Sequence, residues 1–142
     1  MNFNISLPDN LSDEIVKEAD KKNVTPTQFI EILLNSIVFK DQVIFDYVNA
    51  AKVVIDQAED MARLHDIGYT FSLNDLPYFQ KIQHTVSYDG KIAVSTLKAR
   101  IGKNFNRAVA NEKVKNVKRA RKSNNELKFL NGSAVYEVTR DE

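Results

Sequence analysis

The chain has 142 residues, of which 43% are apolar, and this is enough for one ordinary domain or two small ones with a buried core. It contains no cysteine, which excludes disulfide bonds and thiolate metal sites. No apolar run reaches the roughly 18 residues of a membrane span, and the N-terminus lacks the pattern of a signal peptide. We therefore expect a cytoplasmic protein without membrane contact.

The net charge of +1 hides a strong asymmetry between the two halves of the chain. Residues 1–66 contain 12 acidic and 6 basic side chains, a net charge of −6, whereas residues 67–142 contain 7 acidic and 14 basic ones, a net charge of +7. An excess of this size is typical of contact with nucleic acid or another anionic surface. Attraction between the two halves is the alternative explanation.

The first element that the sequence predicts is a β-strand over residues 2–7, because apolar and polar side chains alternate there. The apolar set is Phe3, Ile5 and Leu7, and the polar set is Asn2, Asn4 and Ser6. A lone strand is unstable in water, and the next strand-like segment lies more than sixty residues away. We therefore expect the strand to pair with the same strand of a second copy, in a homodimer or a higher oligomer.

Two helices are expected next. The first follows Pro8 and fades at residues 21–23. The second has a clear start, at which Thr25 can cap the helix, Pro26 occupies its first turn and Gln28 can complete a capping box. The first 40 residues therefore predict the order strand, helix, turn, helix.

A long amphipathic helix is expected from residue 43 to about residue 65, where apolar residues recur at steps of four and three. Its small alanines permit close packing on a partner helix or on the C-terminal half. Because the pattern covers fewer than three heptads, a core helix is favoured over a coiled coil.

The C-terminal half predicts short β elements around one long helix. A strand is expected at residues 69–73, a helix start at residues 74–77, a turn at residues 89–90 and a helix at residues 91–110 with an apolar back and a cationic front. A basic hairpin is then expected from residues 114–122 and 133–139. Helix, helix and hairpin is the order of a winged-helix module.

The segment FNISLPDNLSDEIVKEADKKNVTPTQFIEILLNSIV, within residues 2–38, resembles a ribbon-helix-helix domain of the Arc and MetJ type. The resemblance rests on the strand alternation, the Leu-Pro-Asp strand exit and the Asn23-Val24-Thr25 turn into a capped helix. It implies a dimer whose paired strands enter the major groove of double-stranded DNA. The C-terminal half more loosely resembles an uncharacterised bacterial domain family with a similar helix-then-hairpin ending, which implies no activity.

The ribbon-helix-helix resemblance implies roles for individual residues. Asn2, Asn4 and Ser6 would read base edges, and the N-terminus of the second helix at Thr25 and Thr27 would hold a backbone phosphate. The ribbon face has no basic side chain, and residues 1–40 have a net charge of −2. Either the C-terminal half supplies the missing charge, or the N-terminal module serves only for dimerisation.

The basic half offers a candidate phosphate-binding surface, since residues 113–122 contain six cations in ten positions. A solubilising face is the alternative, but few acidic neighbours are available to pair with these cations. The candidate phosphate ligands in this half are Arg100, Lys103, Arg107, Lys115, Lys118, Arg119, Arg121 and Lys122.

We expect neither an enzyme nor a metal or cofactor site. His65 and His84 have no neighbours at ligand spacing, and no phosphate-binding glycine loop, nucleophile elbow or catalytic triad is present. The carboxylates of Asp56, Glu59 and Asp60 are best explained as a solvated helix face.

These patterns predict a mainly α fold with short β elements, of the α+β class. Its parts are a ribbon-helix-helix domain at residues 1–40, a connecting helix at 41–67 and a basic, winged-helix-like domain at 68–142. The favoured function is a dimeric, sequence-specific transcriptional repressor. The alternative is an antitoxin-like inhibitor, in which the ribbon module dimerises and the C-terminal half binds a partner protein.

Overall fold

The fold is mixed α and β, in a computed structural model that describes residues 2–39, 45–82, 85–87 and 90–140. The helices are α1 (Asp9–Lys21), α2 (Pro26–Val38), α3 (Tyr47–Leu64), α4 (Pro77–Gln80) and α5 (Val94–Ala110), with a 3₁₀ turn η1 (Leu73–Asp75). The strands are β1 (Thr70–Phe71), β2 (Thr85–Ser87), β3 (Gly90–Ile92), β4 (Val117–Arg119), β5 (Phe129–Leu130), β6 (Ser133–Ala134) and β7 (Tyr136–Val138). The α+β class expected from the sequence is therefore confirmed.

The two N-terminal helices form a pair joined by a short turn. α1 ends in a turn at Asn23, whose positive φ of 56° is a conformation that Asn tolerates better than most residues. α2 begins as expected, because Pro26 lies in its first turn and the side chain of Thr25 accepts a hydrogen bond from the backbone N–H of Gln28 at 3.2 Å. Local chemistry therefore sets the boundary between the two helices.

Helix α3 is a core helix, which confirms the favoured alternative. It packs against α5 and α4 of the same chain. Its buried stripe is rich in alanine, which lets the neighbouring helices approach closely. The described helix begins at Tyr47, where Asp46 caps it by accepting from Asn49 N–H at 2.9 Å. The earlier start expected at residues 43 and 44 lies outside the described residues.

The main sheet has three antiparallel strands in the order β1, β7, β4. Tyr136 lies at its centre, between Phe71 and Arg119 in register. The expected pairing of residues 114–122 with residues 133–139 is found in β4 and β7, but the sheet also takes in β1 from before α5. A second, short hairpin of β5 and β6 turns at Asn131 and Gly132, both with positive φ.

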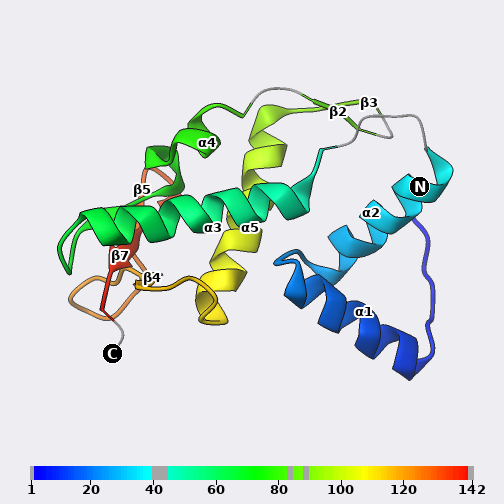
Figure 1. Ribbon diagram of the computed structural model, residues 1–142, viewed down its shortest axis with the longest axis horizontal. Helices are drawn as coiled ribbons and strands as arrows, with labels where there is room; N and C mark the ends of the chain where they lie inside the picture. The colour runs from blue at the N-terminus through cyan, green and yellow to red at the C-terminus, as the bar shows by residue number, and fades with distance from the viewer. Residues whose placement is uncertain (1, 40–44, 83–84, 88–89, 141–142) are drawn as a thin grey trace.

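The N-terminal helix pair is attached to α5 by polar contacts as well as by apolar packing. The side-chain amide of Asn104 donates to the Oε1 of Gln28 at 2.7 Å, and this bond is buried. Arg107 pairs with Asp20 at 2.8 Å. Figure 1 shows the consequence for the shape: the α1–α2 pair lies at one end of the long axis, and the β4 and β7 strands lie at the other.

One local expectation is wrong and another is confirmed. Gln28 does not complete a capping box, because its side chain crosses to Asn104 instead. The helix start expected at residues 74–77 is found, since α4 begins at Pro77. It is preceded by a 3₁₀ turn capped by Ser72, whose backbone N–H donates to Asp75 at 2.9 Å.

Candidate nucleic-acid interface

The N-terminal segment, residues 2–8, is exposed in the single chain. Residues 2–8 have no assigned secondary structure, and they pair with no strand in the described part of the molecule. In the view of Figure 1, the segment crosses the outer end of the α1–α2 pair. The candidate base readers Asn2, Asn4 and Ser6 are all exposed, and so are the residues between them.

The apolar residues of this segment lack the cover that a folded protein normally gives such residues. Phe3 is 79% exposed and Ile5 is 72% exposed. Leu7 of the same segment is exposed as well, and so are large apolar side chains of the helix pair, namely Leu11, Val16, Leu33, Leu34, Ile37 and Val38. Single exposed apolar residues are ordinary, but a set concentrated on one small unit marks an interaction surface.

The start of α2 has the chemistry that an anion contact requires. Thr25 is half-buried and its hydroxyl already accepts from the N–H of Gln28, while Thr27 is exposed. The backbone N–H of Thr27 belongs to the first turn, whose N–H groups have no partner within the helix. Thr27 is therefore the better placed of the two for a phosphate, and Thr25 acts mainly as the cap.

Three arginines of the candidate basic surface are half-buried and make contacts with other residues of the chain. Arg107 pairs with Asp20, and Arg100 donates to the hydroxyl of Tyr47 at 3.0 Å. Arg119 donates to Asn106 at 3.0 Å and lies over the rings of Phe129 and Tyr136. A guanidinium has a flat apolar face and several donors, so it packs against proteins more readily than an ammonium does.

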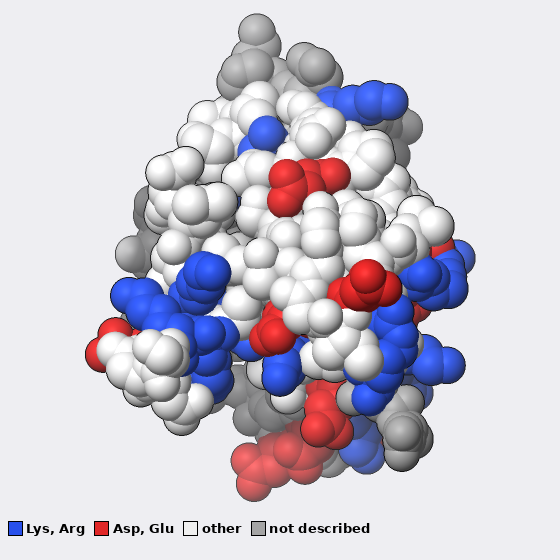
Figure 2. Space-filling model, turned by 90° about the vertical axis from the view of Figure 1, so that its left-hand side faces the viewer, with Lys and Arg blue, Asp and Glu red and all other residues white. Residues whose placement is uncertain are grey.

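The remaining candidate cations are exposed, and four of the five lie on or around β4. They are Lys103, Lys115, Lys118, Arg121 and Lys122. Lys118 lies 3.9 Å from Glu137, and Arg121 donates to the backbone oxygen of Asn125 at 2.8 Å. On the face shown in Figure 2, basic side chains form separate groups with acidic ones between them. β4 also lies at the opposite end of the long axis from residues 2–8, so one chain does not bring the ribbon and the basic strand together (Figure 1).

Asn106 is a central polar residue that the sequence did not single out. Its Oδ1 accepts from Arg119 Nη1 and from the hydroxyl of Tyr136, each at 3.0 Å. Burial raises the pKa of Tyr136 to about 12, an effect that the nearby positive charge of Arg119 partly opposes. Nothing in the local pattern around residue 106 signals this role, since the partners come from β4 and β7.

The histidine that the structure describes has a structural role. His65 ends α3, its Nδ1 lies 3.0 Å from the backbone oxygen of Met61, and its ring stacks on Tyr69 with centroids 3.8 Å apart. His84 lies outside the described residues. Within the described ranges, no group of three or more His, Asp or Glu side chains is arranged to hold a metal ion.

Comparisons with known proteins give no relative for this chain. No family model, no curated protein and no solved structure matches it. None of the helices in the described part is long and apolar enough to cross a membrane.

Proposed function

We propose that the protein is a dimeric, sequence-specific DNA-binding regulator of the repressor type. Residues 2–7 of two copies pair as an antiparallel ribbon above two helix pairs, which is the ribbon-helix-helix arrangement. The observation that carries this proposal is the exposed apolar set on residues 2–8, α1 and α2. A second copy of the chain would bury these apolar side chains and would also form hydrogen bonds with the unpaired backbone of the N-terminal segment.

The alternation of apolar and polar residues over 2–7 supports different roles for the two faces of the ribbon. In a two-stranded ribbon Phe3, Ile5 and Leu7 face the helices, so Asn4 and its polar neighbours face outward. A major groove accommodates such a ribbon, and an Asn amide bonds adenine through two hydrogen bonds. The N–H groups at the start of α2, around Thr27, suit an adjacent phosphate.

The burial and partners of the basic side chains determine which of them can contact phosphate. We propose that Lys115, Lys118, Arg121 and Lys122, in a winged-helix-like C-terminal module, contact phosphates outside the ribbon site. This assignment omits Arg100, Arg107 and Arg119, which are half-buried with partners within the chain, and keeps four cations that are exposed. Because few cations lie near the ribbon, we expect shallow salt dependence for the ribbon contribution and a steeper one for the C-terminal contribution.

The test is a set of binding titrations with the full-length chain on duplexes selected from a random-sequence pool. Truncation after residue 66 is unsuitable, because α3 would lose α5 and expose its buried stripe. Asn4→Ala should reduce the preference for the selected sequence by about 1–3 kcal/mol per lost bidentate contact. Asn111→Ala is the matched control, since Asn111 is also exposed but lies at the end of α5.

A variant that lacks two lysines distinguishes phosphate contacts, which position the protein on DNA, from contacts that read the bases. Lys115→Gln combined with Lys122→Gln should weaken binding to selected and random duplexes alike, and it should flatten the dependence of affinity on salt. If no duplex of the pool is bound at low salt, the protein is not a DNA regulator. If Asn4→Ala changes nothing, the ribbon does not read bases.

The separation of the two surfaces supports a second candidate function. The N-terminal apolar face and the basic strand β4 lie at opposite ends of the long axis (Figure 1), so one can dimerise while the other binds a partner protein, as in an antitoxin-like inhibitor. Its expected partner has an acidic surface. Absence of DNA binding together with salt-sensitive co-purification of an acidic protein would favour this function over the first.

A further inference from the structure

A cavity of about 560 Å³ lies on the side of α5 that faces away from the N-terminal helix pair. Its size is within the range of small-molecule sites. α5 supplies one wall, and residues before and after that helix supply the others. The lining residues that matter for the argument are Phe79, Lys98, Gly102, Lys103, Asn106 and Phe129.

The charged groups of this wall are basic. Lys98 and Lys103 line the cavity, and none of the described residues that line it is Asp or Glu. Asn74, Ser95 and Ser133 also line it, with side chains that can both donate and accept. The oxygen of the Asn106 side chain must face Arg119, because a guanidinium can only donate, and the same oxygen accepts from Tyr136. The two N–H groups of the Asn106 amide are therefore available as donors, and Asn106 lines this cavity as well as a neighbouring one. The wall thus offers positive charge, and no carboxylate among its described residues competes for it.

A third cation, Arg119, contacts the wall without lining this cavity, and it lines a neighbouring one. The guanidinium of Arg119 contacts Asn106, Phe129 and Tyr136, all of which line the cavity. Its Nε and Nη2 atoms are buried and have no hydrogen-bond partner among the described residues. A buried charge that is only partly hydrogen-bonded is costly, and a nearby anion offsets that cost. Arg119 therefore adds to the preference of the cavity for negative charge.

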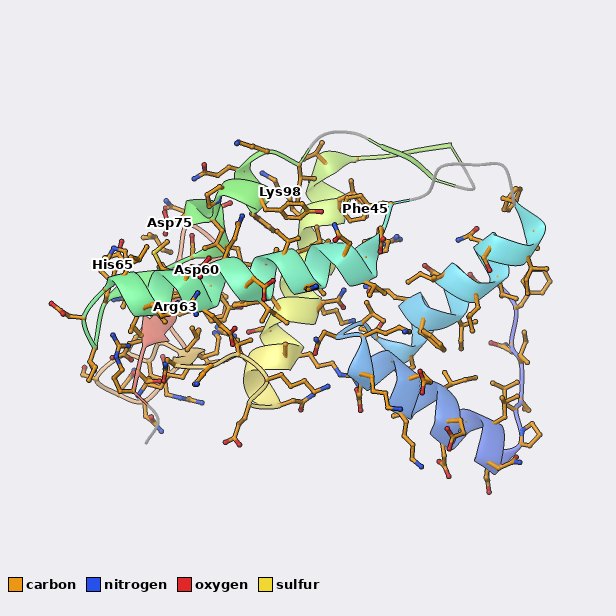
Figure 3. All side chains as sticks on the ribbon, viewed as in Figure 1. Phe45, Asp60, Arg63, His65, Asp75 and Lys98 are labelled. Carbon is orange, nitrogen blue, oxygen red and sulfur yellow. The ribbon has the colours of Figure 1, made fainter. Side chains whose placement is uncertain are left out.

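The apolar part of the wall suits a flat ring. Phe129 is 55% exposed although Arg119 lies 5.2 Å from its ring centroid. Lys98 lies 5.2 Å from the ring centroid of Phe79, and Figure 3 shows Lys98 on the side of α5 that faces α4. An exposed aromatic ring beside cations can stack with a planar ligand that carries a negative group.

Gly102 keeps the floor of the cavity open. It lies inside α5, where glycine is a poor helix former, and its backbone does not require glycine. A Cβ at this position would meet only Leu73 Cδ1, at an ordinary contact distance of 3.8 Å. We therefore explain the glycine at position 102 by the space that it leaves in the cavity, and not by a requirement of the backbone.

We propose that this cavity binds a small organic anion, a carboxylate or phosphate joined to a flat apolar ring. Lys98, Lys103 and the Asn106 amide hold the anionic group, and Phe129 stacks on the ring. This site goes beyond the proposed DNA contact and does not depend on it, since it shares only Lys103 with the phosphate ligands suggested by the sequence.

The test is a titration of the isotope-labelled full chain with 2-naphthoate, 2-naphthamide and inorganic phosphate, followed by amide NMR shifts. We expect 2-naphthoate to shift Ala99, Gly102 and Ser133 with saturation. The neutral amide, which has the same shape, should bind at least tenfold more weakly. Lys98→Gln combined with Lys103→Gln should lower the affinity for 2-naphthoate about tenfold or more. The matched control, Lys17→Gln with Lys52→Gln, removes two exposed cations elsewhere and should leave it unchanged.

Two further variants test the position of the site. Gly102→Leu fills the floor and should abolish binding, while Gly102→Ala should fold at least as well as the wild type and bind more weakly. Shifts from inorganic phosphate alone at the same residues would assign the site to free phosphate rather than to a ring-bearing anion. Three outcomes would each overturn the proposal. The first is equal binding of 2-naphthoate and 2-naphthamide, and the second is unchanged 2-naphthoate binding by both Gly102→Ala and Gly102→Leu. The third is amide shifts confined to residues 2–8 and α2.

Discussion

Substitution of Ile5 by alanine tests the dimer on which the proposed function depends. Ile5 is 72% exposed in the single chain, so a ribbon partner would remove most of its surface from water. The change removes three carbon groups, each worth about 0.8 kcal/mol when buried. Scaled by the exposed fraction, this comes to about 1.7 kcal/mol per copy and about 3.5 kcal/mol per dimer. At about 1.4 kcal/mol per tenfold, the dimer dissociation constant should rise roughly 300-fold.

Sedimentation equilibrium over a range of protein concentrations measures this constant directly. Ile67→Ala is the matched control, because Ile67 is 66% exposed and follows α3, away from the N-terminal helix pair. Neither substitution changes the net charge, so the comparison isolates apolar burial. A wild-type chain that stays monomeric at tens of micromolar, or equal effects of the two substitutions, would refute the reasoning.

Three further predictions concern the stability of the fold. Asn104→Ala leaves the buried Oε1 of Gln28 without its donor, and it should lower the free energy of unfolding, measured by urea denaturation, by about 1–3 kcal/mol. A loss no larger than that caused by an Asn→Ala change at an exposed position would contradict the role of this hydrogen bond. Burial raises the pKa of Tyr136 to about 12, so above pH 10 the unfolded chain ionises first and stability should fall, by up to about 2.7 kcal/mol once pH 12 is passed. Urea midpoints compared from pH 8 to pH 11.5 should fall less steeply for Tyr136→Phe than for the wild type, with a smaller fall remaining from Tyr78, whose pKa burial also raises. Gly132 has a φ of 80°, and a Cβ there would meet no atom within 4 Å, so Gly132→Ala should lower stability by about 1 kcal/mol through the backbone alone. Gly102→Ala should raise stability, because Gly102 lies inside a helix, and the melting temperatures of the two variants should therefore shift in opposite directions.

The elements that the sequence predicts best are those whose boundaries depend on neighbouring residues. The Thr25-Pro26 start of α2 and the turn at Asn23 were both expected, because a cap and a turn need only a few adjacent side chains. The apolar face of α5 was also expected, since its period is a property of the helix itself.

The elements that the sequence misses depend on partners far along the chain. Gln28 has the right spacing for a capping box, but Asn104 lies 76 residues away and offers it a buried hydrogen bond instead. Arg119 sits in a run of cations that suggests a surface, yet its strand is paired with β7, which directs it toward Tyr136 and Asn106. Such pairings leave no local pattern, and a single sequence therefore cannot reveal them.

The two faces of α5 connect the N-terminal helix pair with the cavity. Asn104 and Arg107 on one face hold the N-terminal helix pair, while Lys98, Gly102 and Asn106 on the other face line the cavity. Because a helix is stiff, a ligand that displaces one face moves the contacts of the other. The buried bond between Gln28 and Asn104 is the contact most sensitive to such a displacement, since a shift that separates its atoms leaves two polar groups unsatisfied away from water. Any influence of the cavity on the N-terminal ribbon must therefore be sought first in the hydrogen-bond geometry of this pair.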